Sequence, residues 1–177
     1  MEIYNFNLTQ SLEILRKTPK ILEGLLKDIS DFWTINNEGE NSWNPTQVVK
    51  HLILADKTNW VPRINIILSN SKDKNYKPFE RMDDSIKTDD INLLLKEFKE
   101  IRTESLITLK AKNINQSDLK KTGIHPVFGE VTLAQQISTW CVHDLSHISQ
   151  ICRVMAYQYR EEVGPWSEYL SIIKKNN

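Results

Sequence analysis

Apolar side chains recur at three- and four-residue steps in four separate stretches of this 177-residue chain. That spacing lines them up along one face of an α-helix, so each stretch is predicted to be an amphipathic helix that buries this face. In the first stretch the recurring residues are Leu8, Leu12, Leu15, Leu22, Leu26, Ile29 and Trp33. In the third, from about Asp90 to Lys112, they are Ile91, Leu94, Phe98, Ile101 and Leu109. Four such helices predict an all-α protein built as a four-helix bundle.

Helix-starting sequences set the expected boundaries. The second helix is predicted to begin at Asn44-Pro45-Thr46-Gln47, which supplies an N-cap, an N1 proline and an N3 glutamine, and to run to about Leu68. Pro62 is expected to bend it. The capping box Thr132-Leu133-Ala134-Gln135 opens the fourth helix, which is predicted to reach about Tyr159. Thr18-Pro19 also has an N-cap form, so we expect the first stretch to break there, with a main helix beginning near Pro19.

The segments between the helices are polar and irregular. Residues 69–88 are rich in Lys and Asp and have no periodicity, which predicts a long loop of the kind that often borders a site. A second irregular segment contains Gly123, Pro126 and Gly129, and no strong strand pattern occurs anywhere. After Gly164-Pro165-Trp166 a short amphipathic C-terminal helix is expected through Ile173. The length fits one compact domain, here taken as residues 1–177.

Charge and cysteine content exclude several classes of function. The 23 basic and 23 acidic residues leave a formal net charge of zero, so there is no broad basic field for nucleic acid or an anionic membrane surface. The N-terminal residues do not resemble a signal peptide, and no apolar run is long enough to span a membrane. Cys141 and Cys152 would lie about 16 Å apart on one helix, too far for a disulfide. We therefore expect a cytoplasmic protein with no nucleic-acid or membrane partner.

Three of the four histidines are candidate metal ligands. His143 and His147 are one helical turn apart, so both imidazoles lie on the same side, as two ligands from one helix must. His51 shares a face of the second helix with Val48, Leu54 and Ala55, and so is predicted to point inward. Three nitrogen ligands leave a coordination position open for water or substrate, which is typical of a catalytic site.

Other interpretations of these residues stay open at this point. The histidines could be hydrogen-bonded core residues without a metal. Asp144 lies in the apolar arc of the fourth helix and needs a partner, for which a histidine N–H or a backbone amide is the obvious kind, so it is a candidate to orient a ligand. His125 is expected to line a pocket rather than to be a fourth ligand. A zinc protease is disfavoured, because H-E-x-x-H would need Glu where Asp144 stands.

Four sequence elements, taken in order, resemble one known family. They are Trp43-x-Pro45, Val48-Val49-Lys50-His51-Leu52, Phe128-Gly129-Glu130-Val131-Thr132-Leu133 and His143-Asp144-x-x-His147-Ile148-x-Gln150-Ile151. This set is similar to the DinB/YfiT-like superfamily of metal-dependent enzymes. The resemblance implies an up-down-down-up four-helix bundle, often a homodimer, with a divalent metal held by His51, His143 and His147. Zn or Ni is the expected metal.

The resemblance also limits the candidate activities. Relatives include S-transferases that use a low-molecular-weight thiol, a thiol-dependent isomerase and proteins assigned as hydrolases. The first hypothesis is thus a metal-dependent transferase that delivers a thiolate to a small electrophilic substrate. Lys50, Lys57 and Arg63 are candidates to attract an acidic thiol. The alternatives are a hydrolase that uses metal-bound hydroxide and a non-catalytic metal-binding module of a stress response.

Overall fold

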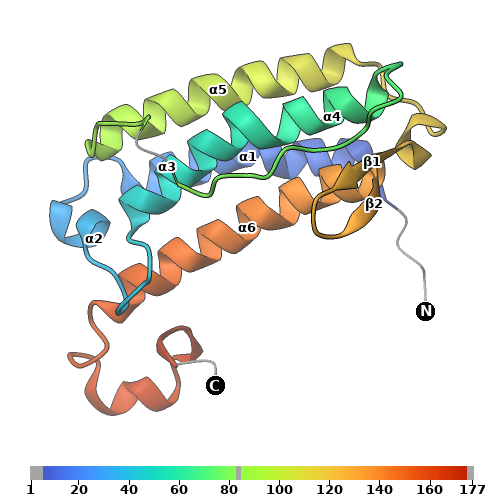
Figure 1. Ribbon diagram of the computed structural model, residues 1–177. Coiled ribbons are helices and arrows are strands. Elements are labelled where there is room, and N and C mark those ends of the chain that lie inside the picture. Colours follow the sequence, from blue (N-terminus) through green and yellow to red (C-terminus); the bar gives the residue numbers. More distant parts are fainter. Residues whose placement is uncertain (1–5, 83–84, 175–177) are drawn as a thin grey trace.

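Four long helical units make up most of the computed structural model, which describes residues 6–82 and 85–174. They are α1 (Leu8–Leu26), α5 (Ile91–Ala111), α6 (Leu133–Tyr157) and a composite second unit made of α3 (Pro45–Ala55), the π-helix η1 (Asp56–Trp60) and α4 (Val61–Leu68). The remaining elements are short: α2 (Asp31–Ile35), the 3-10 helices η2 (Asp118–Lys120), η3 (Gly164–Glu168) and η4 (Ser171–Ile173), and the strands β1 (Thr122–His125) and β2 (Gly129–Thr132). The predicted four-helix bundle is confirmed (Figure 1).

The direction of the helices confirms the up-down-down-up order. Figure 1 shows α1 and α6 running one way and the second unit and α5 running the other. α1 packs against α5 and α6, and α3 packs against the same two helices. Because the second unit and α5 are parallel, the chain must return along the bundle between them, and the described residues 69–82 and 85–90 belong to this return. The loop expected over residues 69–88 is thus explained by topology.

The expected break at Pro19 is wrong, because α1 continues through this residue. A proline inside a helix leaves the carbonyl four residues earlier without its usual N–H donor. That carbonyl belongs to Leu15, and Arg102 Nη1 of α5 donates to it at 3.1 Å. The helix therefore survives its proline because a guanidinium from another helix replaces the missing donor.

The second unit is also irregular, but not at Pro62 itself. Pro62 lies in the first turn of α4, where its missing N–H is tolerated, and the irregularity is the π-helix η1 that precedes it. The wide turn brings Asp56, Asn59 and Trp60 into buried positions together. Single π-turns within helices occur often at functional sites.

A small antiparallel hairpin of β1 and β2 was not expected from the sequence. In the hairpin, Gly123 is opposite Val131. Two backbone hydrogen bonds of 2.9 Å connect the loop to β1: Tyr76 N donates to Ile124 O, and Ile124 N donates to Lys74 O. These four-residue strands are largely exposed or half-buried, so they carry no alternating apolar pattern. The expected C-terminal helix takes the form of the two 3-10 helices η3 and η4.

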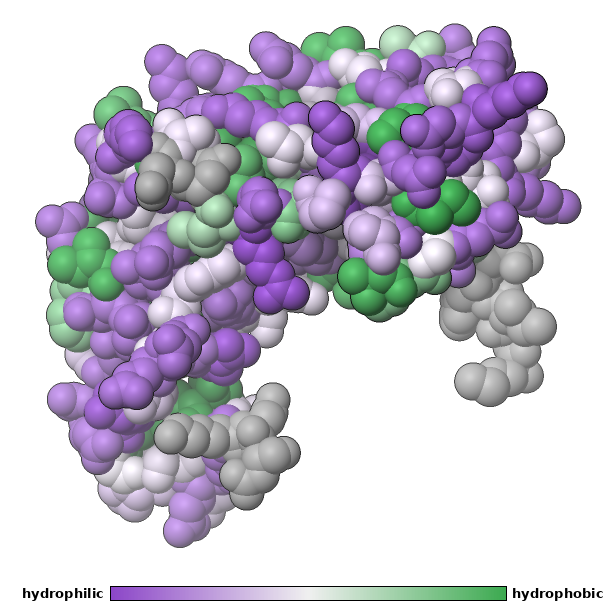
Figure 2. Space-filling view, in the orientation of Figure 1, coloured by the Kyte–Doolittle hydropathy of each residue, from purple (hydrophilic) through white to green (hydrophobic). Residues whose placement is uncertain are grey.

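The buried apolar residues form two clusters along the bundle. The cluster nearer the hairpin includes Leu15, Trp60, Ile64 and Trp140, and the other includes Leu22, Leu52, Phe98 and Ile151. Outside, the face in Figure 2 is mostly hydrophilic, with apolar residues in small separate groups. None of the helices in the described part of the chain is long and apolar enough to cross a membrane.

A polar layer separates the two apolar clusters. It contains one residue from each helical unit: Thr18 of α1, Asp56 of the second unit, Arg102 of α5 and Asp144 of α6. All four are buried, with Asp144 and Thr18 at 0% exposure and Arg102 at 1%. Asp144 directly follows His143 in α6, so this polar layer lies next to the candidate metal ligands.

Candidate metal centre

Three histidines from two helices meet where α3 packs against α6. His51 Nε2 lies 3.0 Å from His143 Nε2, which lies 3.2 Å from His147 Nε2. One ligand atom from each ring lies within 4.8 Å of the other two. His51 is 4% exposed, and His143 and His147 are half-buried. The three side chains singled out from the sequence therefore come together in the folded chain.

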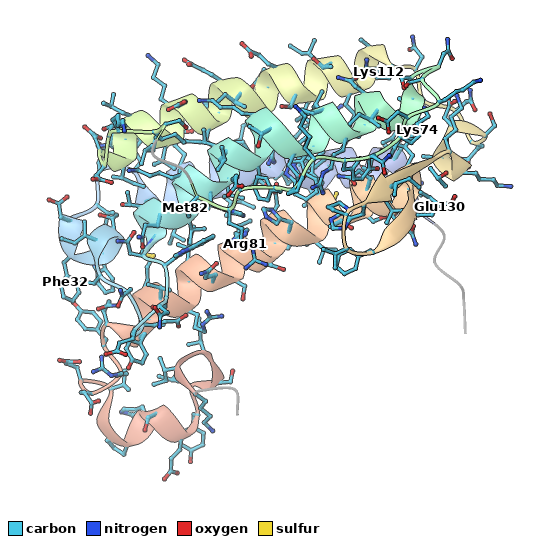
Figure 3. All side chains as sticks on the ribbon, viewed as in Figure 1. Phe32, Lys74, Arg81, Met82, Lys112 and Glu130 are labelled. Carbon is cyan, nitrogen blue, oxygen red and sulfur yellow. The ribbon has the colours of Figure 1, made fainter. Side chains whose placement is uncertain are left out.

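Hydrogen bonds at the outer ring atoms orient two of the imidazoles. His51 Nδ1 lies 2.7 Å from the carbonyl oxygen of Arg81, and His147 Nδ1 lies 2.8 Å from Gln150 Oε1. Both partners are acceptors, so each Nδ1 carries the proton and each Nε2 turns a lone pair inward. Figure 3 shows Arg81 on the loop that crosses in front of the helices, so this loop helps to hold the site. His143 Nδ1 is buried and has no hydrogen-bond partner among the residues that the structure describes.

The environment keeps these imidazoles neutral at ordinary pH. Burial lowers the pKa of His51 to about 4 and that of His143 to about 3, and the neighbouring histidines add to the effect. Burial lowers the pKa of His147 as well, against the hydrogen bond with Gln150. Neutral imidazole is the form that binds a metal.

The donor set fits a divalent cation. The Nε2 atoms of His51 and His147 each turn a lone pair toward His143 Nε2. A proton on His143 Nε2 could form a hydrogen bond with only one of these lone pairs. Without an ion, the other lone pair would therefore face a nitrogen with no hydrogen bond between them. A tetrahedral zinc with Zn–N bonds of about 2.0–2.1 Å holds its ligand nitrogens about 3.3–3.4 Å apart. The two Nε2–Nε2 distances of 3.0 and 3.2 Å are close to this value.

Aromatic side chains surround the three histidines. The ring centroid of Trp43 is 4.8 Å from that of His51, and Trp43 also stacks on His147 at 6.3 Å. Phe79 of the loop lies 5.6 Å from His51, and Trp60 of η1 lies 5.0 Å from His143. These three rings form an apolar surround that limits water around the nitrogens.

Asp144 does not use a histidine N–H or a backbone amide as its partner. Arg102 donates to both of its carboxylate oxygens, and Thr18 Oγ1 donates to Asp144 Oδ2 at 2.7 Å. Arg102 also donates to both oxygens of Asp56, at 2.7 and 3.0 Å, and to Leu15 O. All five N–H donors of Arg102 are thus used. The role of Asp144 in orienting a ligand stays a prediction.

His125 lies apart from the other three histidines. It is in the hairpin, where its Nδ1 accepts hydrogen bonds from the backbone N–H groups of Val127 and Phe128, and its ring stacks on Phe128. It is not part of the histidine cluster. Its expected role in lining a pocket stays a prediction.

The cysteines and the proposed basic residues are now placed. Cys141 and Cys152 are free thiols, and burial raises the pKa of Cys141, as expected of a packing residue. Lys50 pairs with Asp89 and Lys57 with Glu97. Arg63 has no ion-pair partner among the described residues.

Several residues of the site were missed from the sequence. Arg102 is four residues after Phe98 in the buried phase of its helix, and Asp56 follows Ala55 in the second unit. A charge at a position predicted to be buried is the signal that could have found both. Arg81, Trp60 and Phe79 had no such signal, because loop geometry and the π-turn bring them to the histidines.

Comparison with known proteins gives one family and two similar structures. The sequence profile described as the DinB superfamily matches residues 14–151. YfiT from Bacillus subtilis, described as "a probable metal-dependent hydrolase with an unusual four-helix bundle topology", superposes with a TM-score of 0.70 at 18% identity, covering 92% of this chain and 91% of its own. TT2238, described as a four-helix bundle protein, superposes with a TM-score of 0.52 at 20% identity, covering 82% of this chain and 98% of its own. No curated protein matches this sequence.

Proposed function

The chain belongs to the DinB superfamily, and on that premise we propose that it is a metal-dependent enzyme that acts on a small molecule. His51, His143 and His147 would hold the divalent cation. The observation that carries this proposal is the convergence of their three Nε2 atoms, two of which have their protons held on the opposite ring nitrogen. Three protein ligands leave a position open for a reactant.

The bound cation would act as a Lewis acid that activates a water or thiol nucleophile and polarises the bond to be broken. The chain's own residues prepare the site for this. Arg81 O and Gln150 Oε1 hold the Nδ1 protons and so fix the orientation of two rings. Trp43, Trp60 and Phe79 exclude bulk water and offer apolar contact to a substrate.

Hydrolysis is the reaction supported by the comparison with YfiT, which is described as a probable metal-dependent hydrolase. Transfer of a low-molecular-weight thiol is the second candidate. The aromatic surround favours it, because a water-poor site protects a thiolate and its electrophile from competing hydrolysis. The two reactions share their ligands and differ in the nucleophile.

The test begins with elemental analysis of untagged protein purified without chelators or nickel resin. We expect near-stoichiometric Zn or Ni in the wild type and its loss in both His51→Ala and His147→Ala. Gln135→Ala, in the first turn of α6, serves as the control that keeps the metal. Wild-type protein without metal, and without a rise in melting temperature on addition of Zn²⁺ or Ni²⁺, would refute the proposal.

Activity is then measured on a panel of small esters, amides and electrophiles with and without thiols. Turnover without thiol supports hydrolysis, and turnover that is absent without thiol supports transfer. The homodimer and the cytoplasmic location stay predictions. A mass by light scattering that corresponds to one chain at all concentrations would contradict the homodimer.

A further inference from the structure

A cleft of about 520 Å³ lies between the second helical unit and the loop, beyond the histidines. Its floor follows the helical unit from Leu54 to Ile66, and its roof is part of residues 75–80. Phe79 borders both the cleft and the ring of His51. Its volume is in the range of small-molecule sites, which are usually apolar with a few polar groups.

Arg63 is a buried cation in this cleft without a balancing anion. It is 8% exposed, and among the described residues its one hydrogen bond goes from Nη2 to Lys77 O, at 3.4 Å. Its guanidinium also lies 4.9 Å from the ring centre of Tyr76. No carboxylate of the described chain pairs with it, in contrast to Arg102, whose five donors are all used. Burial lowers the pKa of Arg63, so its surroundings disfavour the charge.

Asn59 is a second buried polar residue in the cleft, and its side chain is unpaired within the described part of the chain. Asn59 is 5% exposed, makes no hydrogen bond through its side chain among the described residues, and has a buried Oδ1. Its amide lines the same cleft as Arg63, one helical turn away. Arg63 and the Nδ2 group of Asn59 therefore place unused N–H donors in one cleft, and an anion is the kind of ligand that accepts from both.

The other charged residues of the cleft are exposed and of opposite sign. Lys77 and Glu80 are both at its rim. They balance each other, so Arg63 sets the charge of the interior. The walls beside it are apolar, with Leu54, Ile66 and Phe79 among them.

We propose that this cleft binds a small organic carboxylate, with the carboxylate on Arg63, a hydrogen bond that Asn59 Nδ2 donates to it, and an apolar body that extends toward Phe79. A guanidinium holds a carboxylate through two parallel hydrogen bonds, and it has four unused N–H donors here. Arg63 and His51 are twelve residues apart, about 18 Å along the helical unit, so the bound carboxylate would lie away from the histidine nitrogens although Phe79 borders both sites. Binding does not depend on a metal.

The test uses 4-phenylbutanoate and its neutral amide as probes of EDTA-treated protein, by isothermal titration. We expect the wild type to bind the carboxylate at least tenfold more tightly than the amide, and Arg63→Gln to lose this preference. Lys77→Gln, which removes an exposed charge at the same cleft, should keep it. Equal affinity for the two probes in the wild type, or an unchanged preference in Arg63→Gln, would overturn the proposal.

Two further variants locate the binding and separate it from the proposed function. Thr58→Phe places a ring in the cleft from an exposed position, and should abolish binding of both probes while the thermal unfolding transition persists. This variant also provides the test if Arg63→Gln does not fold. His51→Ala should bind the carboxylate as the wild type does, even if the metal proposal fails. Normal binding in Thr58→Phe, or lost binding in a folded His51→Ala, would show that the site is elsewhere.

Discussion

Replacing Arg102 by Met should destabilise the protein by about 5 kcal/mol at neutral pH. The change leaves Asp56 and Asp144 without a counter-ion, and both side chains are 0% exposed. Removing one partner of a buried ion pair costs about 3–5 kcal/mol. The carbonyl of Leu15 also loses the donor that replaces the N–H missing at Pro19, which adds about 1–3 kcal/mol. The total is comparable with the whole stability of a typical domain, about 5–15 kcal/mol.

The stability lost in Arg102→Met should increase as pH rises. Burial raises the pKa of Asp56 to about 6 even though the charge of Arg102 opposes the rise, so removing Arg102 must raise it further. Between the unfolded pKa, near 3.8, and the raised folded pKa, the folded variant binds more protons than the unfolded chain. Its stability therefore falls as pH rises, by about 1.4 kcal/mol per pH unit for each such carboxyl. Above pH 6, the contribution of Asp56 to the free energy of unfolding should no longer change with pH in the wild type, but should still fall with rising pH in the variant.

Urea denaturation at pH 6, 7 and 8 measures this difference. Lys99→Met is the matched control, because Lys99 is on the same helix and forms an exposed pair with Glu23. Exposed pairs contribute about 0–1 kcal/mol, so the control should change little and without a pH trend. A loss below about 1 kcal/mol for Arg102→Met, or a loss equal at pH 6 and 8, would refute the argument.

The other predictions concern Pro19, Gly123 and the histidines. Pro19→Ala should recover about 1 kcal/mol of the stability lost in Arg102→Met, because an alanine at this position would return a backbone N–H to Leu15 O. Additive effects of the two substitutions in a double-mutant cycle would contradict this. Gly123→Ala should lower the free energy of unfolding by about 1–3 kcal/mol, because the new Cβ would lie 2.4 Å from the Tyr76 hydroxyl. Gly24→Ala, in an open helical position, is the control and should raise that free energy by about 0.5–1 kcal/mol in the same urea denaturation. Metal-free protein should lose stability as pH falls from 6.5 to 4. Over this range histidines of the unfolded chain take up protons, whereas His51 and His143 of the folded protein stay neutral. His51→Ala should therefore make the decline shallower.

The sequence was sufficient for the parts of this fold that local pattern determines. Apolar spacing located four helices, capping boxes located the starts of α3 and α6 within a residue, and helical phase placed His51, His143 and His147 on inward faces. Pro19 was misinterpreted because its compensation comes from Arg102, a residue 87 positions beyond Leu15. The partner of Asp144 was missed for the same reason. A charge in the buried phase of a helix shows that a partner is needed, but the local pattern does not show which distant residue it is.

The order in which these helices pack also affects how the chain can fold. α1 and the second helical unit are consecutive in sequence, yet each packs mainly on α5 and α6. The second unit does pack on the next helix, α5, but the two are parallel and joined by a long return, so among the described helices no consecutive pair of long units forms an antiparallel hairpin. α1 must also find α6 across more than a hundred residues. Folding rates fall as contacting residues become more distant in sequence. This bundle should fold more slowly than an up-down-up-down bundle of equal length, with stopped-flow refolding as the measurement, and the histidines on α3 and α6 should meet only late in the reaction.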